Sequence, residues 1–157
     1  MDDHTRLLSL VSAATISNKQ VNQDAFALVD NPRVPMRAAV VADGLGSHYA
    51  SEVASDLAAR AIADALHGAK TTEDIDLHSA FAAAARRIVN HVAAANDLPA
   101  DIDPANAFGT TAICAVELPT QFTFGYVGNG SILHLRGNFN RFPGSQLLPW
   151  TALNYLN

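Results

Sequence analysis

In Val40-Val41-Ala42-Asp43-Gly44-Leu45-Gly46-Ser47 an apolar run ends in Asp43-Gly44 and a glycine-rich turn. An apolar run of this length is typical of a buried strand, and the glycines mark a place where the backbone comes close to something. A carboxylate at the end of a buried strand is poorly placed for packing and well placed to bind a cation. The stretch therefore predicts a strand that ends in a polar site.

Composition limits the class of protein. The chain has 157 residues, a net charge of -5 and a sequence pI near 5.5. An acidic chain is unsuited to nucleic acid as its main partner, because phosphate backbones require a basic surface. Cys114 is the only cysteine, which excludes an intrachain disulfide and a cysteine zinc cluster. One domain in a reducing, cytoplasmic setting fits this composition.

The first apolar segment is expected to be a strand and not a targeting signal. Asp2 and Asp3 stand where a secretion signal needs positive charge, and the apolar run over 7–14 is short. No run approaches the roughly 18 apolar residues that a membrane span needs. We therefore expect no membrane partner.

Six strands are predicted, three before a helical region and three after it. Before it come 6–16, 25–29 and 36–42, the last of which is expected to be buried on both faces. After it, and after a loop over 98–107, come 110–117, 121–127 and 131–136, separated by short turns. Short turns imply antiparallel pairing. The order predicts an α+β fold with helices packed on an antiparallel sheet.

Two helices are predicted between these groups of strands. The first covers 50–66, with Ser47 as its cap and His67-Gly68 as its stop. Its apolar stripe consists of Val53, Leu57, Ala61 and Ala65. The second covers 72–96, with a stripe made of Leu77, Phe81, Ala84, Ile88, Val92 and Ala95. Arg86, Arg87 and Asn90 fall outside this stripe and are expected to face water.

The segment after residue 137 is rich in apolar side chains but has no evident closing element. It contains Phe139, Phe142, Leu147, Leu148, Trp150, Leu153, Tyr155 and Leu156. We expect the chain to be a single incomplete domain over 1–157, with 138–157 as a truncated tail.

Asp43 is the first candidate for chemistry. Hard cations such as Mg²⁺ or Mn²⁺ prefer carboxylate, carbonyl and water oxygens. Asp43 supplies a carboxylate, Gly44 a backbone carbonyl, and Asp24 can approach from a neighbouring strand. A two-metal site of this kind can activate water and bind a phosphoryl group. The alternative interpretation is that Asp43-Gly44 is only a turn with a helix cap behind it.

Other polar residues are weaker candidates. Lys19 could neutralise phosphate oxygens, although a lone surface lysine is usually just solvated. Gly109-Thr110-Thr111 is expected to pack beside the site without taking part in chemistry. Gly128-Asn129-Gly130 is typical of a hairpin turn. His48 is the histidine nearest the proposed site.

Four of these motifs, in this order over residues 6–137, resemble the protein phosphatase 2C (PP2C, or PPM) family of metal-dependent serine/threonine phosphatases in its bacterial form. They are Lys19-Gln20-Val21-Asn22-Gln23-Asp24-Ala25-Phe26, Val41-Ala42-Asp43-Gly44-Leu45-Gly46-Ser47-His48, Gly109-Thr110-Thr111 and Val127-Gly128-Asn129-Gly130-Ser131. The resemblance implies an α-β-β-α sandwich of two antiparallel sheets flanked by helices, with the C-terminal part missing here.

The resemblance also implies roles for individual residues. Asp43 matches the aspartate that bridges two Mn²⁺ or Mg²⁺ ions, Gly44 the glycine whose carbonyl is a ligand, and Asp24 a further metal residue. Lys19 stands where the family usually has a phosphate-binding arginine and lacks its two-pronged geometry. Gln23 and Asn129 stand where acidic residues are usual, so both departures remove negative charge.

Three functions remain open at this point. The first is a phosphatase acting on phosphoserine or phosphothreonine in a protein substrate. The second is a catalytically inactive relative that binds a phosphoprotein or a serine/threonine kinase, which Gln23 and Asn129 favour. The third is a small α+β binding domain unrelated to phosphate chemistry.

Overall fold

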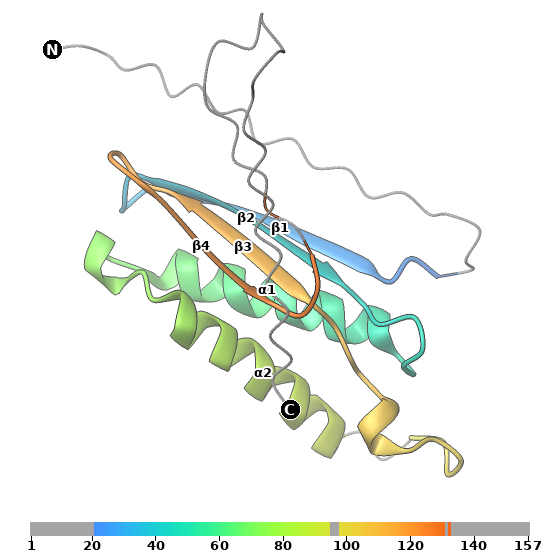
Figure 1. The fold of residues 1–157 in the computed structure, drawn as a ribbon. Helices are drawn as coiled ribbons and strands as arrows, with labels where there is room; N and C mark the ends of the chain where they lie inside the picture. The colour runs from blue at the N-terminus through green and yellow to red at the C-terminus, as the bar shows by residue number, and fades with distance from the viewer. Residues whose placement is uncertain (1–20, 95–97, 131, 133–157) are drawn as a thin grey trace, which may run out of the picture.

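The computed structural model describes residues 21–94, 98–130 and 132 (Figure 1). Its helices and strands are, in chain order, β1 (Asp24–Asn31), β2 (Met36–Asp43), α1 (Ser51–Gly68), the 3₁₀ turn η1 (Thr72–Asp74), α2 (Leu77–Ala94), the 3₁₀ turn η2 (Pro104–Asn106), β3 (Ala112–Glu117) and β4 (Phe122–Val127). The predicted strand over 6–16 lies outside the described residues, as does nearly all of the one over 131–136. The tail over 138–157 lies outside them as well.

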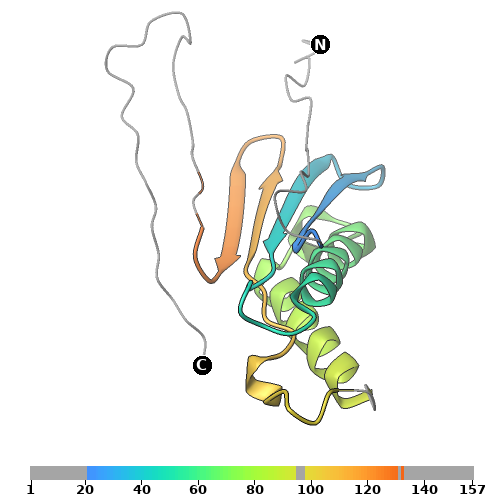
Figure 2. The same ribbon diagram turned by 90° about the vertical axis from the view of Figure 1, so that its right-hand side faces the viewer.

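The four strands form one antiparallel sheet in the order β1-β2-β3-β4. Both helices lie against the same face of this sheet, which gives two layers in the described part of the chain (Figures 1 and 2). The predicted α+β class is therefore confirmed. A second sheet, which the resemblance implies, is not among the described residues.

The core lies between the sheet and α1. Alternate side chains of each strand point to the helices, as the two-residue period of a strand requires. Val40 and Cys114 are fully buried there, opposite Ile62 and Leu66 of α1 in the same core cluster. Burying a side chain of this size stabilises the fold by roughly 1.5–3 kcal/mol.

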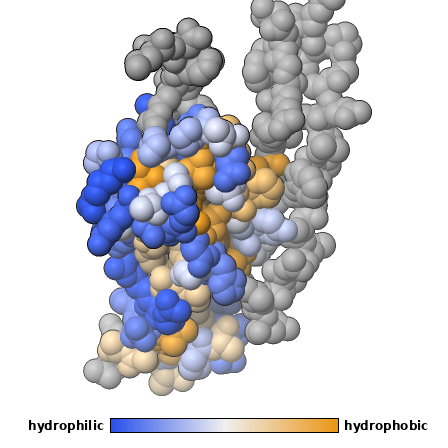
Figure 3. Space-filling view, turned by 90° about the vertical axis from the view of Figure 1, so that its left-hand side faces the viewer, coloured by the Kyte–Doolittle hydropathy of each residue, from blue (hydrophilic) through white to orange (hydrophobic). Residues whose placement is uncertain are grey.

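The other face of the sheet is apolar and exposed. The expectation that 36–42 is buried on both faces is wrong for the described residues, because Val41 is 51% exposed. Its large exposed neighbours on the strands are Phe26, Leu28, Phe122 and Phe124. Apolar surface among hydrophilic surroundings is also visible from the side shown in Figure 3. The sequence is apolar on both faces of β2, but the helices cover only one of them.

The predicted length of helix α1 agrees well with the structure, but the face that it turns to the sheet was predicted only in part. The residues that pack into the core are one position off the predicted stripe, and they are Ala54, Ala58, Ile62 and Leu66. Of the predicted stripe, Ala61 is buried, but Ala65 is exposed. Alanine at so many positions leaves little hydrophobic contrast, so the sequence does not fix which face meets the sheet.

The start of α1 also differs from the expectation. The helix begins at Ser51 after Ala50, which has the left-handed conformation (φ 53°) and makes no side-chain cap. Ser47 is therefore not the cap. Its hydroxyl lies 3.2 Å from Nδ1 of the neighbouring His48.

Helix α2 begins five residues later than predicted, because Thr72–Asp74 forms a 3₁₀ turn instead. Its predicted apolar stripe is confirmed through Val92, since every residue of it is buried or half-buried, although Ala80 outside the stripe is buried as well. Arg86, Arg87 and Asn90 are exposed, as predicted. Gly125 of β4 gives Phe81 room, because a Cβ at that glycine would lie 2.9 Å from the phenylalanine ring.

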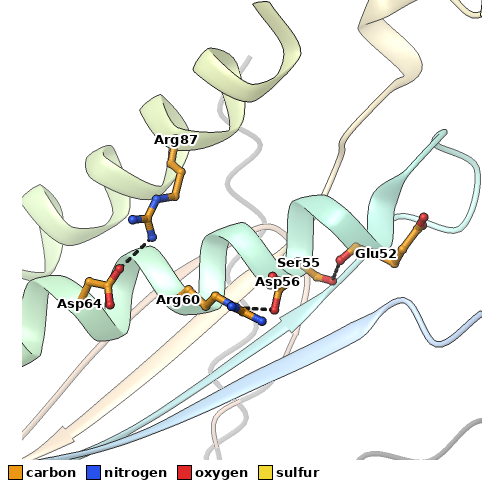
Figure 4. Close-up of polar contacts among 6 residues, drawn as sticks. All are labelled: Glu52, Ser55, Asp56, Arg60, Asp64 and Arg87. Atoms are coloured by element: carbon orange, nitrogen blue, oxygen red, sulfur yellow. Dashed lines mark hydrogen bonds and ion pairs between the residues drawn. The ribbon is translucent and has the colours of Figure 1, made fainter. Parts of the chain in front are cut away.

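Two ion pairs lie on the outer surface of the helical layer (Figure 4). Arg87 of α2 donates to Asp64 of α1 at 2.9 Å, and Arg60 donates to Asp56 one turn away at 2.7 Å. All four side chains are between 45% and 71% exposed, so each pair contributes about 0–1 kcal/mol. Packing, not charge, holds the helices together.

None of the helices described between residues 21 and 130 is both long and apolar enough to cross a membrane.

Candidate metal centre

Asp24 and Asp43 lie opposite each other at one end of the sheet. Asp24 is the first residue of β1, Asp43 is the last of β2, and the antiparallel register pairs them directly. Both side chains belong to exposed residues. Directly paired residues have Cβ atoms about 4.5–5.5 Å apart, so two negative carboxylates share this corner. A hard cation is the natural partner of such a pair.

Gly44 is required here by packing. Its amide donates to the carbonyl of Gln23 at 2.9 Å, which continues the β1–β2 ladder past the aspartates. A Cβ at this position would lie 2.6 Å from the Ser51 carbonyl oxygen and 2.7 Å from that of Gln23. Contacts that short are not tolerated against backbone. Only glycine lets β2 end this close to the start of α1.

The backbone of Asp43 is held by the two threonines that precede β3. The amide of Thr111 donates to the Asp43 carbonyl at 2.9 Å, and the Thr110 hydroxyl donates to the same oxygen at 3.1 Å. The Asp43 amide in turn donates to the Thr111 hydroxyl at 3.3 Å. Gly109-Thr110-Thr111 thus lies beside the site and fixes the main chain of Asp43.

Gln23, Ser51 and Ser55 form a polar cluster behind the aspartates. Gln23 Nε2 donates to the Ser51 hydroxyl at 2.8 Å, and the Ser55 hydroxyl donates to the Gln23 carbonyl at 2.7 Å. Both serines are completely buried. Sequence reasoning missed the serines. The only available signal was that two hydroxyls stand one helical turn apart among alanines.

His48 lies over the glycine that precedes the threonines. A Cβ on Gly109 would lie 2.6 Å from His48 Cδ2 and 2.8 Å from Leu45 Cδ1. The amide of Leu45 donates to the Gly109 carbonyl at 2.9 Å, which joins the two loops. The half-buried His48 imidazole and the Leu45 side chain therefore both pack against Gly109, next to the two aspartates.

An aromatic cluster of Tyr49, His91 and Phe108 packs against the loop after β2 and the loop before β3. Phe108 is buried and has a left-handed backbone (φ 55°). Its ring meets Tyr49 edge-on at a centroid distance of 6.2 Å and His91 of α2 at 5.4 Å. Two backbone bonds between Tyr49 and Phe108 or Asn106 hold the loop after β2 against the loop before β3. The loop that follows Asp43 and the loop that contains Thr110 thus form one unit.

Lys19 lies outside the described residues. Asn129 is exposed, between Gly128 (φ 84°) and Gly130 (φ 156°), which have backbones that favour glycine. Its expected hairpin turn stays a prediction, because the strand that would follow is not described.

A family model for protein phosphatase 2C matches residues 12–146. The chain belongs to the protein phosphatase 2C family. The match spans all the described elements and both aspartates. It supports a phosphatase-type hydrolase at the level of the family. A search of curated proteins found no match to this chain.

The PP2C family depends on metal ions, and such ions need oxygen donors close together. Two carboxylates, with the main chain of Gly44 next to one of them, are oxygen donors of the kind that Mg²⁺ and Mn²⁺ take. Among the described residues no group of three or more histidine, cysteine, aspartate or glutamate side chains is arranged to bind a metal. The donor chemistry of these residues is therefore of the kind that a hard cation takes.

Proposed function

We propose that this chain contributes to a phosphoprotein phosphatase in which Asp24, Asp43 and Gly44 hold divalent cations, Mn²⁺ or Mg²⁺. The substrates are proteins that carry phosphoserine or phosphothreonine. A serine/threonine kinase is a candidate partner, and the cytoplasm is the proposed location.

One observation carries this proposal. The register of β1 and β2 pairs Asp24 directly with Asp43, at the edge of a turn that only glycine can form. Like charges that are directly opposite destabilise an antiparallel pair. A cation turns that repulsion into attraction. In a member of this family the pairing is best explained by metal binding.

Each residue has a separate task in the proposed reaction. When bound, the cations supply an activated water and neutralise negative charge on the phosphate ester. Asp24 and Asp43 hold the cations, and Thr110 and Thr111 keep the Asp43 main chain in place. Lys19 binds phosphate oxygens as a positive charge on a flexible stem.

Gln23 favours a second candidate function. It is uncharged, and its amide is directed at Ser51. A site with one fewer carboxylate attracts cations less strongly. The second candidate is therefore a PP2C-like domain that binds a phosphoprotein or a kinase without hydrolysing the phosphate.

Phosphate release from a phosphothreonine peptide, measured with and without Mn²⁺, separates these functions. We expect Mn²⁺-dependent release by the wild type and a loss of at least about 100-fold in Asp43→Asn, the scale of removing a key electrostatic group. Asp30→Asn is the matched control. Asp30 lies on the same strand and the same sheet face as Asp24, but at the far end, where its partner is Arg37.

Three results are informative. Release by the wild type and by Asp30→Asn, but not by Asp43→Asn, supports the phosphatase. Binding of the phosphopeptide without release supports the inactive relative. Release that is independent of Mn²⁺ and unaffected by Asp43→Asn overturns both proposals.

A further inference from the structure

We infer that Gln23 is a positioning residue: with Ser51 and Ser55 it fixes the Asp43-Gly44 turn against the start of α1. The inference rests on the proposed function, because this turn bears on phosphate chemistry only if Asp43 holds a cation. It assigns Gln23 to the support of the metal residues and not to the metal itself.

Gln23 is tied to α1 at two points. Its side-chain amide donates to Ser51, in the first turn of the helix, at 2.8 Å. Its backbone carbonyl accepts from the hydroxyl of Ser55, one turn further on, at 2.7 Å. The two serines occupy one face of α1, as residues four apart do. The side chain and the main chain of Gln23 are therefore both hydrogen-bonded to helix α1.

The same carbonyl joins Gln23 to the turn. It accepts the amide of Gly44 at 2.9 Å, so the Ser55 hydroxyl and the Gly44 amide share one oxygen. Gln23 directly precedes Asp24, and Gly44 directly follows Asp43. The bond between them therefore sets how the two aspartates approach each other. A shift of Gln23 moves one aspartate directly and the other through Gly44.

Burial makes these bonds effective. Ser51 and Ser55 are 0% exposed, and Gly44 is buried next to the main chains of Ser51 and Gln23. Water competes poorly for hydrogen bonds in such a place, and an unpaired buried polar group is costly. Because the Ser51 main chain lies so close to Gly44, a shift of the turn toward α1 would displace the first turn of that helix.

A glutamate at position 23 can keep these contacts. Its carboxylate can accept from the Ser51 hydroxyl, whereas alanine cannot reach it. Gln23→Glu is therefore the conservative variant, and Gln23→Ala removes the side-chain tie. Ser51→Ala removes the same tie from the helix side and is the second variant if Gln23→Ala fails to fold. Gln121→Ala is the control, because Gln121 is exposed in the turn between β3 and β4.

Two measurements test the inference. The first is the hydrogen-exchange rate of the Gly44 amide, compared with amides of the β2–β3 ladder in the same sample. The second is the dissociation constant of Mn²⁺ alone, from the electron paramagnetic resonance signal of the free ion. In Gln23→Ala we expect Gly44 exchange to rise by at least about tenfold relative to the ladder and Mn²⁺ affinity to fall by roughly 10- to 100-fold.

Gln23→Glu and Gln121→Ala should exchange at Gly44 as the wild type does. That pattern supports the inference. Unchanged Gly44 exchange in both Gln23→Ala and Ser51→Ala overturns it, as does a rise that the whole ladder shares. Faster exchange of the Gly44 amide in Gln23→Ala with an unchanged Mn²⁺ dissociation constant also overturns it. If the wild type itself binds no Mn²⁺, the proposed function fails, and the exchange rates alone decide whether Gln23 holds the turn.

Discussion

Asp24 and Asp43 are direct cross-strand partners at the last rung of the ladder between β1 and β2. The sheet thereby places two carboxylates side by side where helix α1 begins. An apolar sheet gains nothing from this pairing, since it brings like charges together. Repulsion between the two carboxylates lowers the stability of the fold at this corner, and local destabilisation of this kind is typical of functional sites.

The carboxylate pair should destabilise the metal-free protein. Asp24→Asn removes one of two facing charges, so we expect the free energy of unfolding in urea with EDTA to rise by about 0.2–1 kcal/mol. Asp30→Asn should not raise it, because Asp30 faces Arg37. Added salt should shrink the difference, because it screens exposed charges. A loss of stability in Asp24→Asn would show that the two carboxylates do not repel each other.

Gly44 should be intolerant of any side chain. Gly44→Ala forces a Cβ to within 2.6 Å of the Ser51 carbonyl oxygen, and we expect it to lower the free energy of unfolding by about 1–3 kcal/mol. Gly68→Ala is the control. Nothing lies within 4 Å of a Cβ at Gly68, which ends α1, so that variant should be neutral or slightly stabilising. Equal effects of the two substitutions in thermal or urea unfolding would refute this packing.

Asn31 should anchor the far end of α1. It is 3% exposed, and its amide donates to the carbonyls of Leu66, His67 and Ala69 at 2.9–3.3 Å. The Leu66 carbonyl also accepts the Ala69 amide, but Asn31→Ala removes the side-chain donor that all three carbonyls at the end of α1 share, and it should cost about 1–3 kcal/mol.

Asn90→Ala is the control for Asn31→Ala, because Asn90 is exposed on α2 and should change stability by less than about 0.5 kcal/mol. Urea unfolding of both variants measures the difference. If Asn31→Ala is as stable as Asn90→Ala, the anchor contributes nothing.

Cys114 should be chemically inert until the protein unfolds. Burial in the core raises the pKa of its thiol to about 12. The thiolate is the reactive form, and an unfolded cysteine has a pKa near 8.5. At pH 8 a thiol reagent should therefore react at the rate of unfolding. Fast reaction of the folded protein would place Cys114 outside the core.

The raised pKa of Cys114 also has a consequence for stability. Its contribution is fully present below the unfolded pKa of about 8.5 and is lost as the pH rises toward 12. Cys114→Ala should lack this alkaline loss, although it will be less stable overall because it leaves a cavity.

The sequence was sufficient for those parts of the fold that local patterns determine. The predicted strand over 25–29 lies within β1, the apolar run over 36–42 predicted β2, and the short turns between strands after residue 110 predicted β3 and β4. Leu77, Phe81 and Ile88 gave α2 a clear apolar stripe. In α1 the predicted stripe and the stripe that packs on the sheet each contain two large apolar residues and two alanines, so the periodicity did not distinguish between them.

Only the parts of the site that belong to short sequence motifs could be predicted. Asp43-Gly44 was identified from a strand that ends in Asp-Gly, but the pairing with Asp24 depends on the register of β1 and β2. The tie from Gln23 to Ser51 spans 28 residues and exists only once α1 packs on the sheet. No local pattern encodes a contact of that kind. Lys19 lies outside the described residues and stays a prediction.

Direct binding of Mn²⁺ to the wild type and to Asp43→Asn, with Asp30→Asn as the matched control, tests whether the facing aspartates form the metal site. Titration at pH 7 and low ionic strength should give saturable binding to the wild type and to Asp30→Asn. Asp43→Asn should bind at least about tenfold more weakly, a difference of about 1.4 kcal/mol. Equal Mn²⁺ affinity in all three proteins would contradict the account, because the facing aspartates would then not be the metal site.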